Sequence, residues 1–311
     1  MKSFSFSNGY SIPALGLGTW LSKPKEVGEA VKTAIAAGYR HLDCAYVYGN
    51  EKEIGEALKD ALAENNLKRE DVFITTKLWN SFHASEDVEQ NLRISLADLQ
   101  TDYIDLYLMH WSIAFRKGHD QPDEPNVILP PDKIPFSDTW RAMIALKDKG
   151  LVRNIGVSNF SATKLDRLIA DTGITPAMNQ VEVHPYFKQN DLLAYCKAKN
   201  ILVTAYSPLG SSRLLKRGTP LYDEPILVEI AEKHSATPSQ VMLAWGIERG
   251  YAVIPKSTNR ERIIENFGAL NVELDADDMA KISAIAHDER LSTGAYAMIE
   301  GSPYNSANLW D

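Results

Sequence analysis

The sequence has few cysteines and no long apolar run, and both shortages limit the class of protein. Only two cysteines, Cys44 and Cys196, occur among 311 residues, which argues against a disulfide framework and favours two reduced thiols in a cytosolic protein. The opening residues, M-K-S-F-S-F, lack the apolar core of a signal peptide. No apolar run approaches the roughly 18 residues of a membrane-spanning helix, so we expect a cytoplasmic protein with no membrane partner.

The chain also lacks an excess of positive charge and any sign of internal division. Its formal net charge of −8 disfavours nucleic acid as the main partner, so any anionic ligand must be held by a local basic cluster. There is no low-complexity linker and no repeat of solenoid period. With 44% hydrophobic residues the chain can bury one large core, and we expect a single domain over residues 1–311.

A missing glycine motif bears on the fold class. No G-x-G-x-x-G follows the first strand-like run, so the main signature of an open dinucleotide-binding sheet is absent. The chain instead alternates short apolar runs with longer segments that have one apolar face, a pattern typical of a parallel sheet covered by helices. The predicted strands are residues 15–18, 39–43, 72–77, 104–109, 152–157, 177–182, 201–206 and 252–254. This alternation predicts an α/β fold, a single (β/α)8 TIM barrel.

Three segments depart from the alternation. The first dozen residues alternate polar and apolar side chains around Asn8-Gly9, which predicts a β-hairpin that plugs the barrel. Residues 111–135 carry five prolines, and residues 207–225 form a second long connection. Long loops in compact domains are usually functional, so we expect these loops to lie over the C-terminal mouth of the barrel, the first as a lid.

Polar side chains close several of the predicted strands. Asp43 and Lys77 end their runs, His110 follows the fourth run, and Tyr48 lies five residues after Asp43. Because a barrel gathers the carboxyl ends of its strands at one mouth, we expect these four groups to converge there. An ammonium about 4 Å from a phenol favours the phenolate by about 4 kcal/mol at an effective dielectric of about 20, so Lys77 is expected to lower the pKa of Tyr48. Such a site suits protonation of a carbonyl oxygen as hydride reaches its carbon, or the reverse reaction.

Other interpretations of the same residues stay open at this point. A strand-ending Asp or Lys often belongs to a structural ion pair, and a histidine beside a tryptophan is often a packed core residue. A barrel lyase that uses Lys77 as a Schiff base is a further alternative, although a charged lysine beside Asp43 is a poor nucleophile. A metal site is disfavoured, because His41 and Asp43 have no further set of histidine ligands.

The motifs that carry these residues run through the whole chain. They are G-Y-R-H-L-D-C-A-Y-V-Y-G-N-E, I-T-T-K-L-W, D-Y-I-D-L-Y-L-M-H-W, V-R-N-I-G-V-S-N-F, N-Q-V-E-V-H-P-Y, A-Y-S-P-L-G-S, and I-P-K-S-T followed by R-I-I-E-N. In these long, ordered motifs the chain resembles the aldo-keto reductase family. The resemblance implies that Tyr48 is the general acid/base, that Lys77 and Asp43 tune it, and that His110 orients the substrate carbonyl.

The resemblance also implies a reaction and a cofactor. It implies NADPH-dependent reduction of aldehydes or ketones to alcohols, with NADH less favoured; the alternative is a catalytically weak nucleotide-binding regulatory or structural protein on the same fold. Lysine and arginine beside a hydroxyl form an anion site that suits a phosphate monoester, and the family pattern places the adenosine 2′-phosphate there. The implied cofactor residues are Ser158, Asn159, Gln180, Tyr206, Ser207, Leu209, Ser211, Lys256, Ser257, Thr258, Arg262, Glu265 and Asn266. For the polar residues that follow the strands, the alternative role is to cap the strand ends. For the lysine and arginine, the alternative is a surface pair that binds no ligand.

The substrate pocket is expected to be apolar. Residues at or just past strand ends that match its lining in the family are Trp20, Val47, Trp79, His110, Trp111 and Phe115. Aromatic walls with a few convergent polar groups suit a small carbonyl compound, whether aldose, uronate or aliphatic or aromatic aldehyde. Ser112 stands where the family usually has Pro. We expect a monomer with no obligate protein partner.

Overall fold

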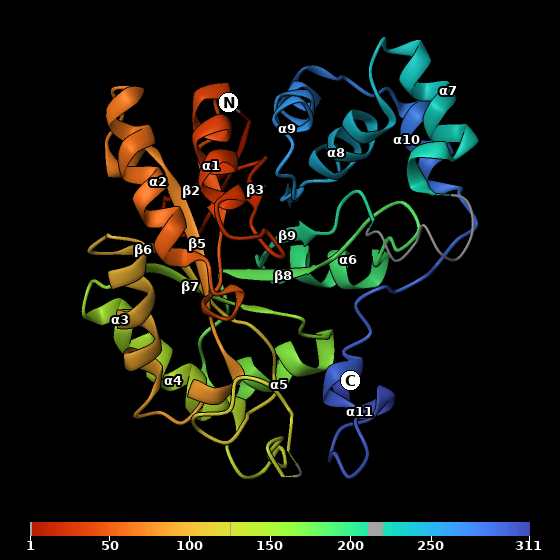
Figure 1. The fold of residues 1–311 in the computed structure, drawn as a ribbon. Helices are drawn as coiled ribbons and strands as arrows, with labels where there is room; N and C mark the ends of the chain where they lie inside the picture. The colour runs from red at the N-terminus through yellow and green to blue at the C-terminus, as the bar shows by residue number, and fades with distance from the viewer. Residues whose placement is uncertain (1, 125, 211–219) are drawn as a thin grey trace.

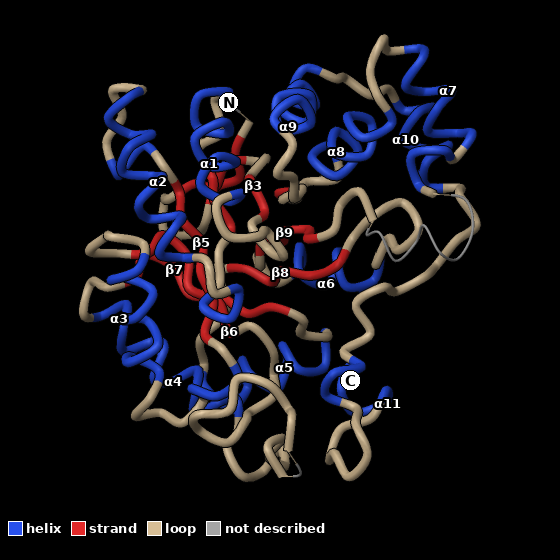
Figure 2. The backbone as a smooth tube through the Cα atoms, viewed as in Figure 1, coloured by secondary structure: helices blue, strands red, loops and turns tan. Residues whose placement is uncertain are grey.

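The computed structural model describes residues 2–124, 126–210 and 220–311, and its centre is an eight-stranded parallel sheet. The strands in sheet order are β10 (Ala252–Val253), β9 (Leu202–Tyr206), β8 (Met178–Glu182), β7 (Val152–Ser158), β6 (Ile104–Met109), β5 (Phe73–Leu78), β4 (His41–Asp43) and β3 (Leu17–Gly18). Leu15 bridges Val253 and Gly18 bridges Lys256 in parallel register, so the two edges meet. The predicted (β/α)8 barrel is confirmed, and Figure 2 shows the strands surrounded by helices.

Helices follow the strands along the outside of the barrel (Figure 1). They are α1 (Glu26–Ala37), α2 (Glu51–Glu64), α3 (Val88–Asp98), α4 (Phe136–Asp148), α5 (Ala162–Thr172), α6 (Asn190–Ala198), α7 (Pro225–Lys233), α8 (Pro238–Glu248), α9 (Arg260–Phe267), α10 (Ala276–Ser283) and α11 (Ser306–Trp310). The sequence signal at the start of α8 is confirmed, because the Thr237 hydroxyl accepts from Gln240 N at 3.3 Å and the Gln240 amide oxygen accepts from Thr237 N at 2.9 Å. None of the helices in the described residues is long and apolar enough to cross a membrane.

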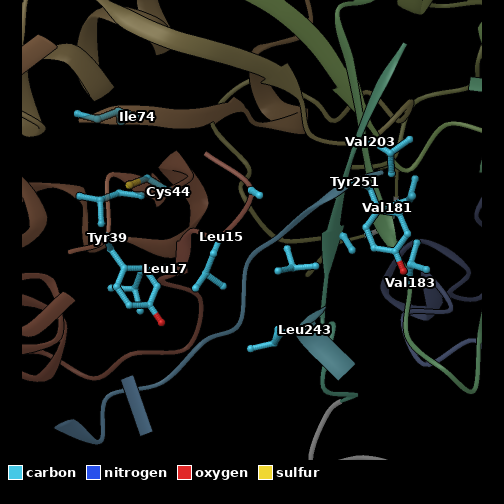
Figure 3. Close-up of a cluster of buried hydrophobic side chains, with 14 of the residues drawn as sticks. Leu15, Leu17, Tyr39, Cys44, Ile74, Val181, Val183, Val203, Leu243 and Tyr251 are labelled. Atoms are coloured by element: carbon cyan, nitrogen blue, oxygen red, sulfur yellow. The ribbon is translucent and has the colours of Figure 1, made fainter. Parts of the chain in front are cut away.

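The alternation of side chains along each strand divides the core into layers. On β5, Ile74 packs in the large cluster between sheet and helices, whereas Phe73 packs in a second cluster inside the barrel. Figure 3 shows side chains of the outer layer, including Leu17 and Val203 from the strands and Leu243 from α8. Lys77 has the same strand parity as Phe73, so it also points into the barrel.

The predicted N-terminal hairpin is present and fills one end of the barrel. β1 (Ser3–Ser5) pairs antiparallel with β2 (Ser11–Pro13), and Gly9 adopts a φ of 89° in the turn, which glycine tolerates without strain. The interior cluster groups Phe6 and Ile12 of this hairpin with inward-facing residues of the barrel strands: Phe73, Leu106, Leu108, Met178 and Ala252. The hairpin therefore seals the end of the barrel opposite the polar strand ends.

The structure differs from the sequence prediction mainly at element boundaries and in the tail. The second barrel strand begins at His41 rather than residue 39, because Tyr39 N still bonds to Ala34 O at 2.9 Å in the turn that ends α1. The prediction that residue 39 belongs to an apolar run inside the protein is correct, since Tyr39 is fully buried. The tail, for which no element was predicted, contains η7 (Ala295–Ala297) and α11. The described part of the 111–135 loop forms one antiparallel bridge, from Phe115 to Ile128, before α4.

We predict that Ile12→Ala will lower the free energy of unfolding by about 2–5 kcal/mol, because it empties a fully buried position in the hairpin plug. Ser11→Ala, at the exposed neighbouring position, should change it by less than about 0.5 kcal/mol. Urea unfolding followed by circular dichroism measures both. Equal stabilities of the two variants would mean that the hairpin adds little to the barrel core.

Candidate active site

Four polar residues meet at the mouth of the barrel. The Lys77 ammonium nitrogen lies 2.6 Å from Asp43 Oδ1, 2.7 Å from the Cys44 main-chain oxygen and 3.3 Å from the Tyr48 hydroxyl oxygen. The Tyr48 and His110 rings lie edge to face with their centroids 5.9 Å apart. The expected convergence of the four side chains is therefore observed at the carboxyl ends of β4, β5 and β6.

Local structure explains how Tyr48 reaches Lys77. Tyr48 ends the short 3-10 helix η1 (Tyr46–Tyr48), and Gly49 turns the chain with a φ of 66° before α2 begins. The Thr19 hydroxyl donates to Asp43 O at 2.8 Å, and the Asn50 side chain donates to Thr19 O at 3.0 Å. These bonds tie the segment after β4 to the loop after β3.

Lys77 and Asp43 form a fully buried ion pair, and each group is satisfied on all sides. Burial alone lowers the pKa of Lys77, but the charge of Asp43 and the hydrogen bonds to Asp43 and Tyr48 outweigh it, so the pKa is raised above its usual value. The second carboxylate oxygen of Asp43 accepts from Gln180 Nε2 at 2.6 Å. Lys77 is therefore a charged ammonium at neutral pH.

The expected lowering of the Tyr48 pKa is wrong for this structure. Although part of Tyr48 is exposed at the mouth, burial of its hydroxyl raises the pKa to about 12, with Lys77 opposing that shift and Asp43 adding to it. The loss of solvation disfavours the phenolate more than one ammonium can favour it, because Asp43 already neutralises that ammonium. Tyr48 consequently holds its proton at neutral pH and can act as a proton donor.

His110 is a neutral imidazole. Burial lowers its pKa well below the usual value, and the positive charge of Lys77 and the proximity of His83 lower it further. The His110 Nδ1 atom is buried and has no hydrogen-bond partner among the described residues. Asn159 Nδ2 donates to His110 O at 3.1 Å, which ties the residue to the end of β7. A neutral ring carries one N–H that can donate to a substrate oxygen.

The residues predicted for the nicotinamide lie along the same rim, on β7, β8 and β9. Ser158 Oγ donates to Gln180 O at 2.8 Å, and the Tyr206 hydroxyl donates to Asn159 Oδ1 at 2.7 Å. Gln180 Oε1 accepts no hydrogen bond from any residue that the structure describes, so it can accept one from a carboxamide. This free amide oxygen fits the N–H of that group. Ser207 and Leu209 follow β9 on this rim, and the predicted Ser211 lies outside the described residues.

The predicted basic cluster lies at the start of α9. Ser257 and Thr258 precede the helix, and Asn259 caps it by accepting from Arg262 N at 2.9 Å. Lys256 donates to Leu21 O at 3.3 Å, and neither Lys256 nor Arg262 forms an ion pair within residues 2–124, 126–210 and 220–311. Two unpaired cations beside helix amides fit an anionic group.

The residues expected near the adenine differ in their surroundings. Glu265 accepts from the Thr237 hydroxyl at 3.0 Å and is exposed, whereas Asn266 is buried with 4% of its surface exposed. The structure thus leaves the Glu265 carboxylate accessible at the helix surface. It holds Asn266 inside the protein.

Aromatic side chains wall the mouth beside His110. Trp79, Trp111 and Phe115, which were predicted to line the substrate pocket, are buried in one cluster, with Val47 packed against it. The Trp79 ring lies edge to face with His110 at 5.2 Å. Trp20, which was also predicted to line the pocket, differs from these buried residues, because 49% of its surface is accessible.

Two residues of the tail also belong to this aromatic wall, and the sequence did not predict them there. Tyr296 stacks on Trp79 at 6.3 Å and its hydroxyl accepts from Asn80 Nδ2 at 3.2 Å, while Trp310 lies edge to face with Trp111 at 5.5 Å. The abundance of aromatic residues in the tail was the only signal for them. Lys164 of α5 holds the tail in place, because it donates to the main-chain oxygens of Asn308, Leu309 and Asp311 at 3.0, 2.8 and 2.6 Å.

Comparison with known proteins identifies the family. The family model described as Aldo/keto reductase family matches residues 14–287. The chain belongs to the aldo/keto reductase family. It is therefore an oxidoreductase that acts on carbonyl compounds, and members of this family use a nicotinamide cofactor.

Individual members of the family are similar over most of the chain. An aldo/keto reductase from Synechocystis sp. is 45% identical over 316 residues, covering 100% of this chain and 97% of its own length. Aldo-keto reductase family 1 member A1 from Bos taurus is 46% identical over 283 residues, covering 89% of this chain and 87% of its own. The structure of the aldose reductase from Schistosoma japonicum superposes with a TM-score of 0.90 at 41% identity, covering 98% of this chain and 99% of that chain.

We predict that Asp43 and Lys77 of this aldo/keto reductase depend on each other for stability. Asp43→Asn or Lys77→Met alone should cost about 3–5 kcal/mol, because each leaves a buried charge without its partner. The double variant should cost less than the sum of the single costs by at least about 1.5 kcal/mol. Urea unfolding of the four proteins at pH 7 measures the coupling, and additive costs would contradict a strong buried pair.

Proposed function

We propose that the protein is an NADPH-dependent reductase that converts aldehydes and ketones to alcohols, with Tyr48 as the proton donor. One observation carries the proposal. A phenol lies 3.3 Å from an ammonium that a buried carboxylate holds at 2.6 Å, at a barrel mouth walled by aromatic rings. This arrangement suits transfer of one proton to a carbonyl oxygen in an apolar pocket.

Each residue of the site has a separate role in the proposed reaction. A nicotinamide cofactor, when bound, would supply the hydride for the carbonyl carbon. Tyr48, protonated at neutral pH, gives its proton to the carbonyl oxygen, and the ammonium of Lys77 stabilises the phenolate that remains. His110, a neutral imidazole, donates its N–H to the same oxygen and so orients the carbonyl. Asp43 keeps Lys77 charged and in place.

The preference for NADPH rests on the cluster at the start of α9. Lys256 and Arg262 are exposed cations that form no ion pair in the described part of the chain, and they suit a ribose 2′-phosphate better than a ribose diol. Ser158, Asn159 and Gln180 would hold the carboxamide, and Tyr206 would stack on the ring. Ser207, Leu209 and Ser211 would lie along the pyrophosphate, with Glu265 and Asn266 near the adenine.

The proposed substrates are small aliphatic or aromatic aldehydes and aldoses. The cluster of Trp79, Trp111 and Phe115 gives the pocket an apolar wall that favours such carbonyls. A uronate would need a cation for its carboxylate, and the last cation of the tail, Arg290, already lies 3.6 Å from the Trp310 ring. We also propose that the enzyme is a cytoplasmic monomer made of one domain over residues 1–311.

A nucleotide-binding regulatory protein on the same fold is the second candidate, because the cofactor residues would serve it equally well. Steady-state assays with NADPH and a broad panel of aldehydes, glyceraldehyde included, separate the two. Tight cofactor binding without turnover on any aldehyde would favour the regulatory protein.

We predict that Tyr48→Phe will lower kcat by at least about 100-fold, because it removes the proton donor and leaves the ring in place. NADPH should still quench the protein fluorescence with a Kd within about twofold of the wild type. Tyr46→Phe is the matched control, since among the described residues its hydroxyl donates to Asp120 alone, at 3.2 Å, and the kcat of this variant should stay within about threefold. Wild-type turnover in Tyr48→Phe would refute the mechanism.

We predict that Arg262→Ala will weaken NADPH binding by about tenfold or more and leave NADH binding nearly unchanged, because the guanidinium would contact only the 2′-phosphate. Arg260→Ala removes another exposed arginine from the first turn of the same helix and should change neither Kd by more than about twofold. Fluorescence titration of the two variants with NADPH and with NADH measures the four dissociation constants. Equal losses for NADPH and NADH would contradict the assignment of the phosphate site.

A further inference from the structure

Glu51 carries a buried carboxylate for which the proposed reaction has no use. It is the first residue of α2, three positions after Tyr48, and only 3% of its surface is exposed. Within the described residues it forms no ion pair, and the hydroxyl of Thr76 donates a hydrogen bond to its Oε1 atom. Burying a carboxylate without a cationic partner is costly, so a specific role is expected for it.

The partner of Glu51 links it to the proposed catalytic residues. Thr76 is fully buried on β5 and immediately precedes Lys77, and its side chain faces outward because strand residues alternate. The hydrogen bond therefore joins the helix that follows Tyr48 to the strand that carries Lys77. Figure 1 shows α2 alongside β5.

A second bond fixes the same segment from the other side. Asn50 Nδ2 donates to Thr19 O at 3.0 Å, and Thr19 in turn donates to Asp43 O at 2.8 Å. Only Gly49 separates Tyr48 from these two anchored residues, Asn50 and Glu51. The place of the phenol relative to Lys77 thus depends on how firmly the start of α2 is held.

We propose that Glu51 is a positioning residue whose ionised carboxylate, through the hydrogen bond from Thr76, holds the Tyr48 phenol against the Lys77 ammonium. A hydrogen bond to a charged acceptor is roughly twice as strong as one between neutral groups. Protonation of Glu51 therefore loosens the start of α2 and lets the phenol move from its place. The inference rests on the proposed function and adds to it a group outside the four site residues.

The surroundings of Glu51 place this change near neutral pH. Burial raises the pKa of Glu51 to about 7, against the opposing effect of the hydrogen bond from Thr76 and of the nearby Ser95 hydroxyl. The titratable groups that act on it or feel its charge are Asp98 on α3, Lys77 on β5, Cys44 after β4, Tyr107 on β6 and Tyr46 on η1. Asp98 raises its pKa and Lys77 lowers it. The loosened form should therefore accumulate as the pH falls below about 7.

Steady-state kinetics with NADPH and glyceraldehyde between pH 5.5 and 9 tests the proposal. Wild-type kcat should fall several-fold below about pH 7, whereas Glu51→Gln should have a kcat about three- to tenfold lower at pH 8 and no further fall through this range. The KM for the aldehyde should stay within about twofold, since the pocket wall is unchanged. Glu56→Gln, at an exposed position of α2, should behave as wild type.

The Thr76 variants test the hydrogen bond from its other end. Thr76→Val should lower kcat about tenfold, and Thr76→Ser, which restores a hydroxyl, should recover most of it. These two variants still test the proposal if Glu51→Gln fails to fold. Wild-type kcat and an unchanged pH profile in Glu51→Gln, or equal kcat in the two Thr76 variants, would overturn the proposal.

A stability measurement separates this proposal from the proposed function. Because the pKa of Glu51 is higher in the folded than in the unfolded chain, the folded state binds more protons between about pH 4.5 and 7, and stability falls as the pH rises through that window. The unfolding midpoint in urea of wild type relative to Glu51→Gln should accordingly drop from pH 5 to pH 8. A constant difference would overturn the ionisation of Glu51, whereas absence of turnover in the wild type would overturn the reductase assignment alone.

Discussion

The buried pair of Lys77 and Asp43 is the interaction on which the rest of the site depends. An ammonium can stay charged inside a barrel only if every donor is used, and here three acceptors surround it: Asp43, the Cys44 carbonyl and Tyr48. Gln180, from the opposite side of the barrel mouth, satisfies the remaining oxygen of Asp43. Removing any one of these contacts would leave a charge or a polar atom exposed to a medium that solvates it poorly.

The two ends of the barrel have different roles. The hairpin closes the N-terminal end with apolar side chains, which supply stability at a distance from the chemistry. The other end carries the charges, the neutral imidazole and the aromatic wall, and the loops and tail complete it. The ammonium of Lys77, paired with the Asp43 carboxylate, lies beside a protonated phenol. The site is therefore arranged for a negative charge that develops on oxygen rather than for one that is already present.

Much of the fold and of the candidate site could be predicted from the sequence, because periodicity identifies strands and a closed parallel barrel brings their carboxyl ends together. That reasoning placed Asp43, Lys77 and His110 in one site without coordinates. It could not give the direction of the Tyr48 pKa, which depends on how far the hydroxyl is buried. Nor could it find the Glu51–Thr76 contact or the place of Tyr296, since both join segments whose relative position depends on packing and not on local pattern.

The central claim is that a phenol kept protonated by burial stands beside a permanently charged lysine. The most direct test is a difference titration of tyrosinate absorbance near 295 nm, wild type minus Tyr48→Phe, in the free protein from pH 7 to pH 12. The account predicts no phenolate from Tyr48 below about pH 10, the range in which an ordinary tyrosine titrates, and ionisation only near the pKa of about 12. Phenolate formation at or below about pH 8 would contradict it.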